Sequence, residues 1–148
     1  MIAVDTDVLA IYFIFKWDPR FEVAKTVIDS ENVKAITIVN ALELMGLMSI
    51  AESGAKAREL FSLLHRRRDF HVLYWRTWLE QQVFVSKVLE YVSSRRSPFT
   101  DALIGWILEE NGIELLVTWN TRHFVSRYSF ETITPEQYLG LTPPLSDN

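Results

Sequence analysis

The chain has 148 residues, of which 49% are hydrophobic and 13% aromatic. This is enough to bury one substantial core and too short to predict two domains. The formal net charge of -4 argues against a protein that binds nucleic acid over a broad basic face, although it does not exclude a nucleic-acid enzyme that uses divalent cations. Because the chain has no cysteine, disulfides, thiolate metal ligands and cysteine nucleophiles are excluded.

The N-terminal segment MIAVDTDVLAIYFIFKWD has neither a basic leader nor a small-residue cleavage site, and Asp5 and Asp7 interrupt it. We therefore do not interpret it as a signal peptide. The apolar run over residues 8–15 is far shorter than the about 20 residues that a membrane-spanning helix needs. We expect a soluble, cytoplasmic protein.

In the first half of the chain, short β-branched runs alternate with helical patterns. Residues 2–4 read as a buried strand, closed by Asp5-Thr6-Asp7, of which Asp7 is the expected N-cap of the following helix. The further elements expected are a short helix over 21–29, a strand over 33–38, a helix over 40–50 buried nearly all round, and a surface helix with apolar positions from Ala57 to Leu64.

The second half continues this alternation. We expect a strand over 70–75, a long amphipathic helix ending near Arg95-Arg96, a helix over 102–110 with Thr100 as N-cap, a strand over 114–118, and a last strand over 132–139 that passes through Pro135 into a helical turn. Apolar strands alternating with helices predict an α/β fold with a mainly parallel sheet covered on both faces. We assign residues 1–141 to one domain and expect residues 142–148 to be a flexible tail.

Three carboxylates stand alone in apolar segments. Glu43 is the only ionisable residue between Lys34 and Glu52, and Asp101 is the only one between Arg96 and Glu109. Asp5 should follow the first strand, at the edge of a parallel sheet where ligands bind. Taken singly, each acid has an ordinary explanation as a cap, a partner of the helix dipole or half of a distant ion pair. If the three meet, their repulsion calls for a cation, and oxygen ligands suit Mg²⁺ or Mn²⁺ better than zinc.

The stretches IAVDTDVL, ITIVNALELMG, FTDALIGWILEENGIELLVTWNTRHF and ITPEQYL carry a resemblance to a known family. In this order they resemble the PIN-domain family, and within it the toxin ribonucleases of VapBC-type toxin–antitoxin pairs. Together they cover most of the chain, whereas residues 53–96 match mainly in helical character. The resemblance implies a single PIN-like, Rossmann-like, three-layer domain, with a central sheet flanked by helices.

The resemblance also implies an activity and a site. The expected activity is Mg²⁺- or Mn²⁺-dependent cleavage of single-stranded regions of RNA by a metal-activated water, with an antitoxin protein and a second copy of the chain as partners. Asp5, Glu43 and Asp101 fall on the principal acids of the family. Asn120 falls where many members carry a fourth acid, so it is either a neutral ligand of the metal or a turn residue, and occupancy of a second metal is in doubt.

Polar residues next to these positions are candidates to support the acids or to contact RNA. Thr6 and Thr118 are candidates to hydrogen-bond the ligand carboxylates. Arg122 and His123 are candidates to contact RNA phosphate because they follow Asn120, while surface roles remain an alternative.

Two other functions stay open at this point. Asp5-Thr6-Asp7 after a strand also fits a haloacid-dehalogenase-like phosphatase, in which Asp5 is the nucleophile and Asp7 the acid–base, although the Gly and Thr that usually follow are missing. The other alternative is a PIN-like binding module without catalysis, for which Asn120 is the one hint.

Overall fold

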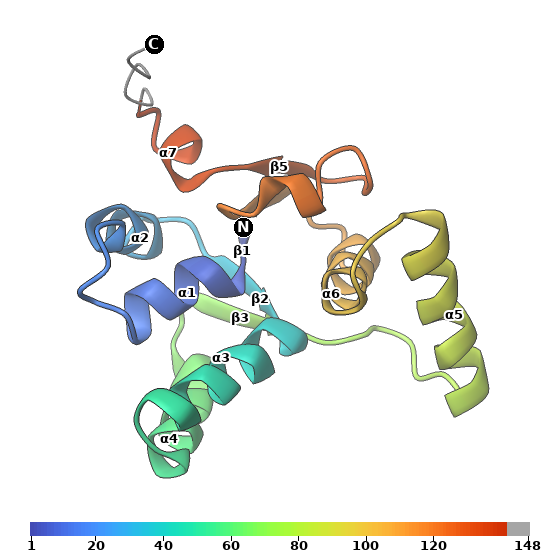
Figure 1. Cartoon of the computed structure of the whole chain (residues 1–148), viewed down its shortest axis with the longest axis horizontal. Coiled ribbons are helices and arrows are strands. Elements are labelled where there is room, and N and C mark those ends of the chain that lie inside the picture. The colour runs from blue at the N-terminus through green and yellow to red at the C-terminus, as the bar shows by residue number, and fades with distance from the viewer. Residues whose placement is uncertain (142–148) are drawn as a thin grey trace.

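The computed structural model describes residues 1–141, so the predicted tail, residues 142–148, lies outside the described residues. Five strands form one sheet in which every pair of neighbours is parallel (Figure 1). Their order across the sheet is β3-β2-β1-β4-β5. The strands are β1 (Ile2–Val4), β2 (Lys34–Thr37), β3 (Phe70–Leu73), β4 (Leu115–Val117) and β5 (Glu131–Ile133). The predicted α/β class with a parallel sheet is confirmed.

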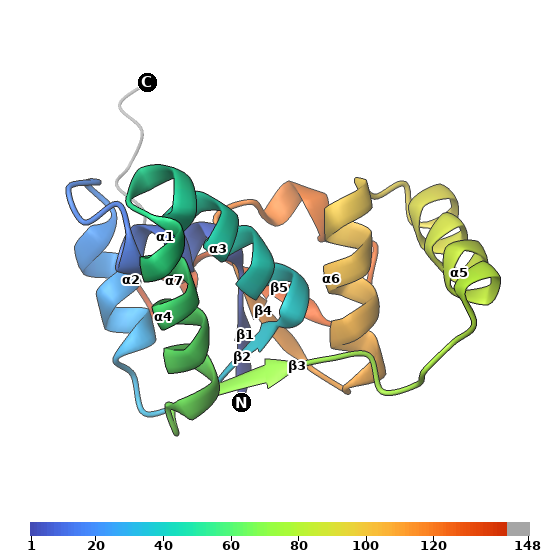
Figure 2. The ribbon, with the colours of Figure 1, turned by 90° about the horizontal axis from the view of Figure 1, so that it is seen from below.

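Helices cover both faces of this sheet (Figure 2). The first face carries α1 (Thr6–Phe13), α2 (Phe21–Ile28), α3 (Ile38–Ala51) and α4 (Gly54–Arg66). The second carries α6 (Phe99–Glu110), with α5 (Gln81–Ser94) packed on its outer side. A 3₁₀ turn, η1 (Thr121–His123), follows β4, and α7 (Pro135–Tyr138) lies beside α2. No helix within residues 1–141 combines the length and the apolar character that a membrane span requires.

The core lies between the sheet and its two helical layers. Every residue of β1 and β2 is buried, which explains why β1 and the middle of β2, residues 35–36, are apolar without alternation. Leu9 of α1 and Leu44 of α3 are fully buried on the first face, and Ile104 and Ile107 of α6 are fully buried as well. The short apolar strands are therefore a consequence of burial from both sides.

Helix α3 is less buried than the sequence predicts. It begins at Ile38 with a capping box, in which Thr37 and Asn40 satisfy each other's backbone N–H groups. Its buried side carries Ala41, Leu44 and Met48, while Leu42 and Ile50 are 57% and 87% exposed. The prediction of a helix buried nearly all round was wrong, because only one side of α3 packs against the rest of the domain.

Three predicted boundaries also differ. Asp5, not Asp7, is the N-cap of α1, and Asp7 lies in its first turn. Helix α6 begins at Phe99 with Pro98 at its N-cap, so Thr100 is not the cap, because the fixed φ of proline suits a helix start. The last strand ends at Ile133, where Thr134 caps α7 through its own capping box.

Candidate active site

The candidate site lies at the carboxyl ends of β1 and β4, which are neighbours in the sheet. From β1 the chain proceeds to β2 on one side, whereas β4 pairs with β1 on the other side. This is the topological switch point at which open parallel sheets bind ligands. Asp5 follows β1 and Thr118 follows β4, and the backbone N–H of Asp5 donates to the carbonyl of Val117 across 3.1 Å.

Asp5 is the most buried of the acids, with 6% of its surface exposed. Its Oδ1 accepts from the backbone N–H of Thr6 at 2.8 Å and from Asn40 Nδ2 at 3.0 Å, and its Oδ2 accepts from the Thr118 hydroxyl at 2.8 Å. Burial raises the pKa of Asp5 to about 7, and the negative charges of Asp7 and Asp101 contribute in the same direction. This carboxyl group is therefore held by neutral donors, and no basic side chain within residues 1–141 forms an ion pair with it.

Glu43 reaches the same region from α3. The residue lies on the exposed side of the helix, and its Oε1 accepts from the Thr6 hydroxyl at 2.9 Å. Desolvation of the carboxyl group raises the pKa of Glu43, and the charges of Asp101 and Asp7 raise it further. The bond through Thr6, which also contacts Asn40, links Glu43 to Asp5.

Asp101 lies in the first turn of α6, as predicted. Its Oδ2 is 2.8 Å from Nδ1 of His123, and the same nitrogen lies 2.7 Å from Nδ2 of Asn120. Burial raises the pKa of Asp101, while the hydrogen bond and the charge of His123 oppose that rise. One imidazole nitrogen either donates or accepts, so the tautomer of His123 decides whether it donates to Asp101 or accepts from Asn120.

Asp7 has a structural explanation. Its Oδ1 accepts from the backbone N–H of Val8 at 2.7 Å, and its Oδ2 accepts from the N–H of Trp119 at 2.9 Å and the hydroxyl of Thr118 at 3.2 Å. These bonds fasten α1 to the end of β4. Because both oxygens are engaged in this way, the geometry does not favour Asp7 as the acid–base of a phosphatase.

The structure also tests the residues that surround the acids. The predicted hydrogen bonds of Thr6 and Thr118 to carboxylates are confirmed. Sequence reasoning missed Asn40, which is 1% exposed and donates to both Asp5 and the Thr6 hydroxyl. The available clue was the Thr-x-x-Asn pattern after a strand, which is typical of a capping box. The amide in this pattern is buried, and a buried amide needs hydrogen-bond partners.

The two predicted RNA-contacting residues have different surroundings. Arg122 is exposed, and no ion pair within residues 1–141 involves it. His123 turns inward to Asp101 and Asn120. Contact of either residue with RNA stays a prediction.

Within residues 1–141, no three His, Asp or Glu side chains lie close enough together to form a ready-made metal site. The acids are instead held in two hydrogen-bonded groups, one joining Asp5 to Glu43 through Thr6 and one joining Asp101 to His123. The oxygen donors nevertheless suit a hard divalent cation, because carboxylate oxygens are the ligands that Mg²⁺ and Mn²⁺ prefer. The donor set therefore fits Mg²⁺ or Mn²⁺.

Solved structures with the same architecture are known. A toxin–antitoxin complex from Klebsiella pneumoniae contains a chain that matches with a TM-score of 0.62 at 18% identity, over 91% of this chain and 98% of that one. VapBC-1 from nontypeable Haemophilus influenzae matches with a TM-score of 0.59 at 18% identity, over 91% and 98%. The toxin VapC20 of Mycobacterium tuberculosis, which cleaves the sarcin–ricin loop, matches with a TM-score of 0.57 at 20% identity, over 78% and 87%.

The chain has a PIN-like fold. The predicted fold is thus confirmed by structures that share little of the sequence. No family model matches the chain, and no curated protein matches it with significance. What this PIN-like chain shares with these toxins is the fold, so its activity has to be argued from its own residues.

Proposed function

We propose that this protein is a divalent-metal-dependent ribonuclease that cleaves single-stranded regions of RNA, and that it is the toxin of a toxin–antitoxin pair. The observation that carries the proposal is that acids from three separate segments are hydrogen-bonded to residues that follow β1 and β4: Thr6 contacts both Asp5 and Glu43, and His123 contacts Asp101. Desolvation is the main cause of the raised pKa of Asp5 and of Glu43, and the charge of Asp101 raises both further. Clustered carboxyl groups of raised pKa are typical of functional sites.

The residues that would hold the cation are Asp5, Glu43 and Asp101, with the amide oxygen of Asn120 as a neutral fourth ligand. A bound Mg²⁺ or Mn²⁺ supplies a water nucleophile at neutral pH and offsets the charge of the phosphodiester. A cation also explains why Asp5 and Glu43, which form no ion pair within residues 1–141, lie at a ligand-binding edge of the sheet, because it would offset the repulsion between the acids.

The neighbouring side chains keep the acids in position. Thr118 and Asn40 donate to the two oxygens of Asp5, so this carboxylate is fixed in orientation. Thr6 directs Glu43 toward it, and His123 holds Asp101. Such supporting hydrogen bonds orient metal ligands and commonly affect activity strongly when they are removed.

The toxin role and the partners are part of the same proposal. The fold is shared with chains of toxin–antitoxin complexes, and one of the compared toxins cleaves RNA. We propose an antitoxin protein and a second copy of this chain as partners, in the cytoplasm. Expression of the protein should arrest bacterial growth, and co-expression of a cognate antitoxin encoded by the neighbouring gene should restore it.

The decisive experiment is RNA cleavage by the purified protein with Mg²⁺ or Mn²⁺. Asp5→Asn, Glu43→Gln and Asp101→Asn should each remove most of the cleavage while the fold remains intact by circular dichroism. Glu59→Gln is the matched control, because Glu59 is an exposed acid on α4 away from the sheet edge. Full cleavage by any of the three variants removes that residue from the site, and no metal-dependent cleavage by the wild type overturns the proposed activity.

A further inference from the structure

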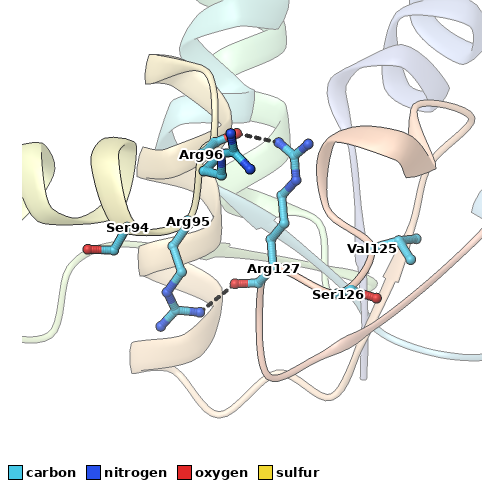
Figure 3. A pocket seen from close by; sticks show the side chains of 6 residues that line it. All are labelled: Ser94, Arg95, Arg96, Val125, Ser126 and Arg127. Atoms are coloured by element: carbon cyan, nitrogen blue, oxygen red, sulfur yellow. Dashed lines mark hydrogen bonds between the residues drawn. The ribbon is translucent and has the colours of Figure 1, made fainter.

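A cavity of about 440 Å³ lies between the turn that joins α5 to α6 and the segment that precedes β5 (Figure 3). Three of its lining residues are arginines: Arg95, Arg96 and Arg127. In Figure 3 the side chain of Arg127 extends toward Arg96, while Arg95 reaches the backbone of Arg127. In a chain with a net charge of -4, three arginines around one cavity are a local concentration of positive charge.

Within residues 1–141, Arg95 is the one arginine of the three that has a carboxylate partner. Arg95 forms a two-pronged ion pair with Glu109, with N–O distances of 2.9 and 3.1 Å. For Arg96 and Arg127, no carboxylate within residues 1–141 comes within 4.0 Å. Arg127 uses Nη1 to donate to the carbonyl of Arg96 at 2.6 Å, and its other N–H groups have no partner among the described residues. Two guanidinium groups are thus available to an anion.

The walls of the cavity are fastened to each other. The hydroxyl of Tyr128 donates to Ser97 at 2.7 Å, and Arg95 donates to the carbonyl of Arg127 at 2.6 Å. Arg96 follows the C-cap of α5 with a φ of 51°, and the N–H of Ser97 donates to Val92, as in a Schellman motif. Glycine is the usual residue at this position, so an arginine here adopts an unfavourable conformation.

This cavity adjoins the candidate active site. The hydroxyl of Tyr128 also lies 3.4 Å from the carbonyl oxygen of Asp101. Tyr128 directly follows Arg127 in the chain, so this contact places the arginine side of the cavity next to the first turn of α6, where Asp101 lies. An anion held by Arg127 would therefore lie beside one of the proposed metal-binding acids.

We propose that Arg96 and Arg127 form a binding site for a backbone phosphate of the RNA, next to the acids that carry out cleavage. The inference rests on the ribonuclease function proposed above. Guanidinium groups bind phosphate oxygens in paired, charge-assisted hydrogen bonds, which gives the contact both strength and direction. Such a contact positions the strand without reading its sequence.

The test measures binding of a labelled single-stranded RNA oligonucleotide in EDTA at several salt concentrations, so that cleavage does not interfere. The variants are Arg96→Gly, which places the preferred residue at the end of α5, and Arg127→Gln. The control is Arg68→Gln, which removes an exposed arginine at the amino end of β3, the opposite edge of the sheet.

We expect the double variant, Arg96→Gly with Arg127→Gln, to bind RNA about tenfold more weakly than wild type. The slope of log affinity against log salt concentration should fall in magnitude by about 0.7, the value for one phosphate of a single strand. DNA of the same sequence should lose affinity equally, and the melting temperature of Arg96→Gly should hold or rise. The phosphate site would be overturned if the double variant bound RNA with the affinity and salt slope of the wild type. It would also be overturned if the affinity fell for RNA but not for DNA. Cleavage by the wild type with Mn²⁺ is measured in parallel, so a failure of the proposed activity is seen separately.

Discussion

The imidazole of His123 pairs with the carboxylate of Asp101, with 2.8 Å between Nδ1 and Oδ2. The pair joins the turn after β4 to the first turn of α6, so it fixes an acid of the candidate site from a segment 22 residues away. His123 is the strongest candidate for a positioning residue, because it opposes the rise in the pKa of Asp101 that burial causes.

His123→Ala should therefore slow RNA cleavage about tenfold or more and shift the acid limb of the pH–rate profile to higher pH. The physical reason is that Asp101 loses the hydrogen bond from the imidazole, together with the positive charge of the protonated ring, and both of these lower its pKa. His71→Ala is the control, since His71 is exposed on the edge strand β3. If His123 acts by contacting RNA instead, the salt slope of RNA binding will change and the pH profile will not.

The metal-free protein should become less stable as the pH rises from about 4 to about 7. Burial raises the pKa of Asp5 to about 7 in the folded protein, from an ordinary value of 3.8. Between these values the folded state binds a proton that the unfolded state releases, so the free energy of unfolding falls by up to about 1.4 kcal/mol per pH unit. Above pH 7 the ionised, buried carboxylate contributes its full destabilisation.

Thermal melts in EDTA at pH 5 and pH 8 check this sign. Asp5→Asn should lose most of the difference between the two pH values and should be the more stable protein at pH 8. Asp29→Asn, which changes an exposed aspartate with a lowered pKa, should keep the wild-type fall. An equal fall in Asp5→Asn would mean that Asp5 is ionised in the folded protein throughout this range.

Asn120 should tune the metal requirement of cleavage. Its side chain contacts His123, which joins it to Asp101. Asn120→Asp adds a negative charge beside the acids, so the Mg²⁺ concentration for half-maximal cleavage should fall, and Asn120→Ala should raise it. Both effects should be smaller than those of the three acids, since an amide contributes only a dipole. Wild-type metal titrations in both variants would make Asn120 a turn residue.

The fold could be predicted from the sequence because strands that are buried on both faces form short apolar runs. The apolar runs before Asp5 and before Thr118 became β1 and β4, and their ends meet at one edge of the sheet. Glu43 and Asp101 were identified because an isolated charge in an apolar segment is conspicuous. That they act together with Asp5 as one site stays a prediction.

What the sequence did not predict depends on packing between distant segments. An all-apolar helix pattern does not reveal which side of α3 stays in solvent, so Leu42 and Ile50 were expected to be buried. Asp5 and Asp7 have the same capping chemistry two residues apart, so the sequence did not reveal that the cap is Asp5 and not Asp7. The bond from Asn40 to Asp5 and the approach of Arg127 to Arg96 join segments that only the folded chain brings together.

A pair of glycine substitutions should have opposite effects on stability. A Cβ at Gly105 of α6 would lie 2.1 Å from the ring of Tyr128, which stacks on Phe130 and is tied to Ser97 through its hydroxyl. Because that ring is held from two sides, Gly105→Ala should lower the free energy of unfolding by about 1–3 kcal/mol.

Gly46 of α3 is the matched control, since a Cβ there meets no atom within 4 Å. Gly46→Ala should raise the free energy of unfolding by up to about 1 kcal/mol, because alanine loses less conformational entropy in a helix. Chemical denaturation of both variants measures the two signs directly. A Gly105→Ala variant as stable as wild type would show that the ring of Tyr128 moves aside freely.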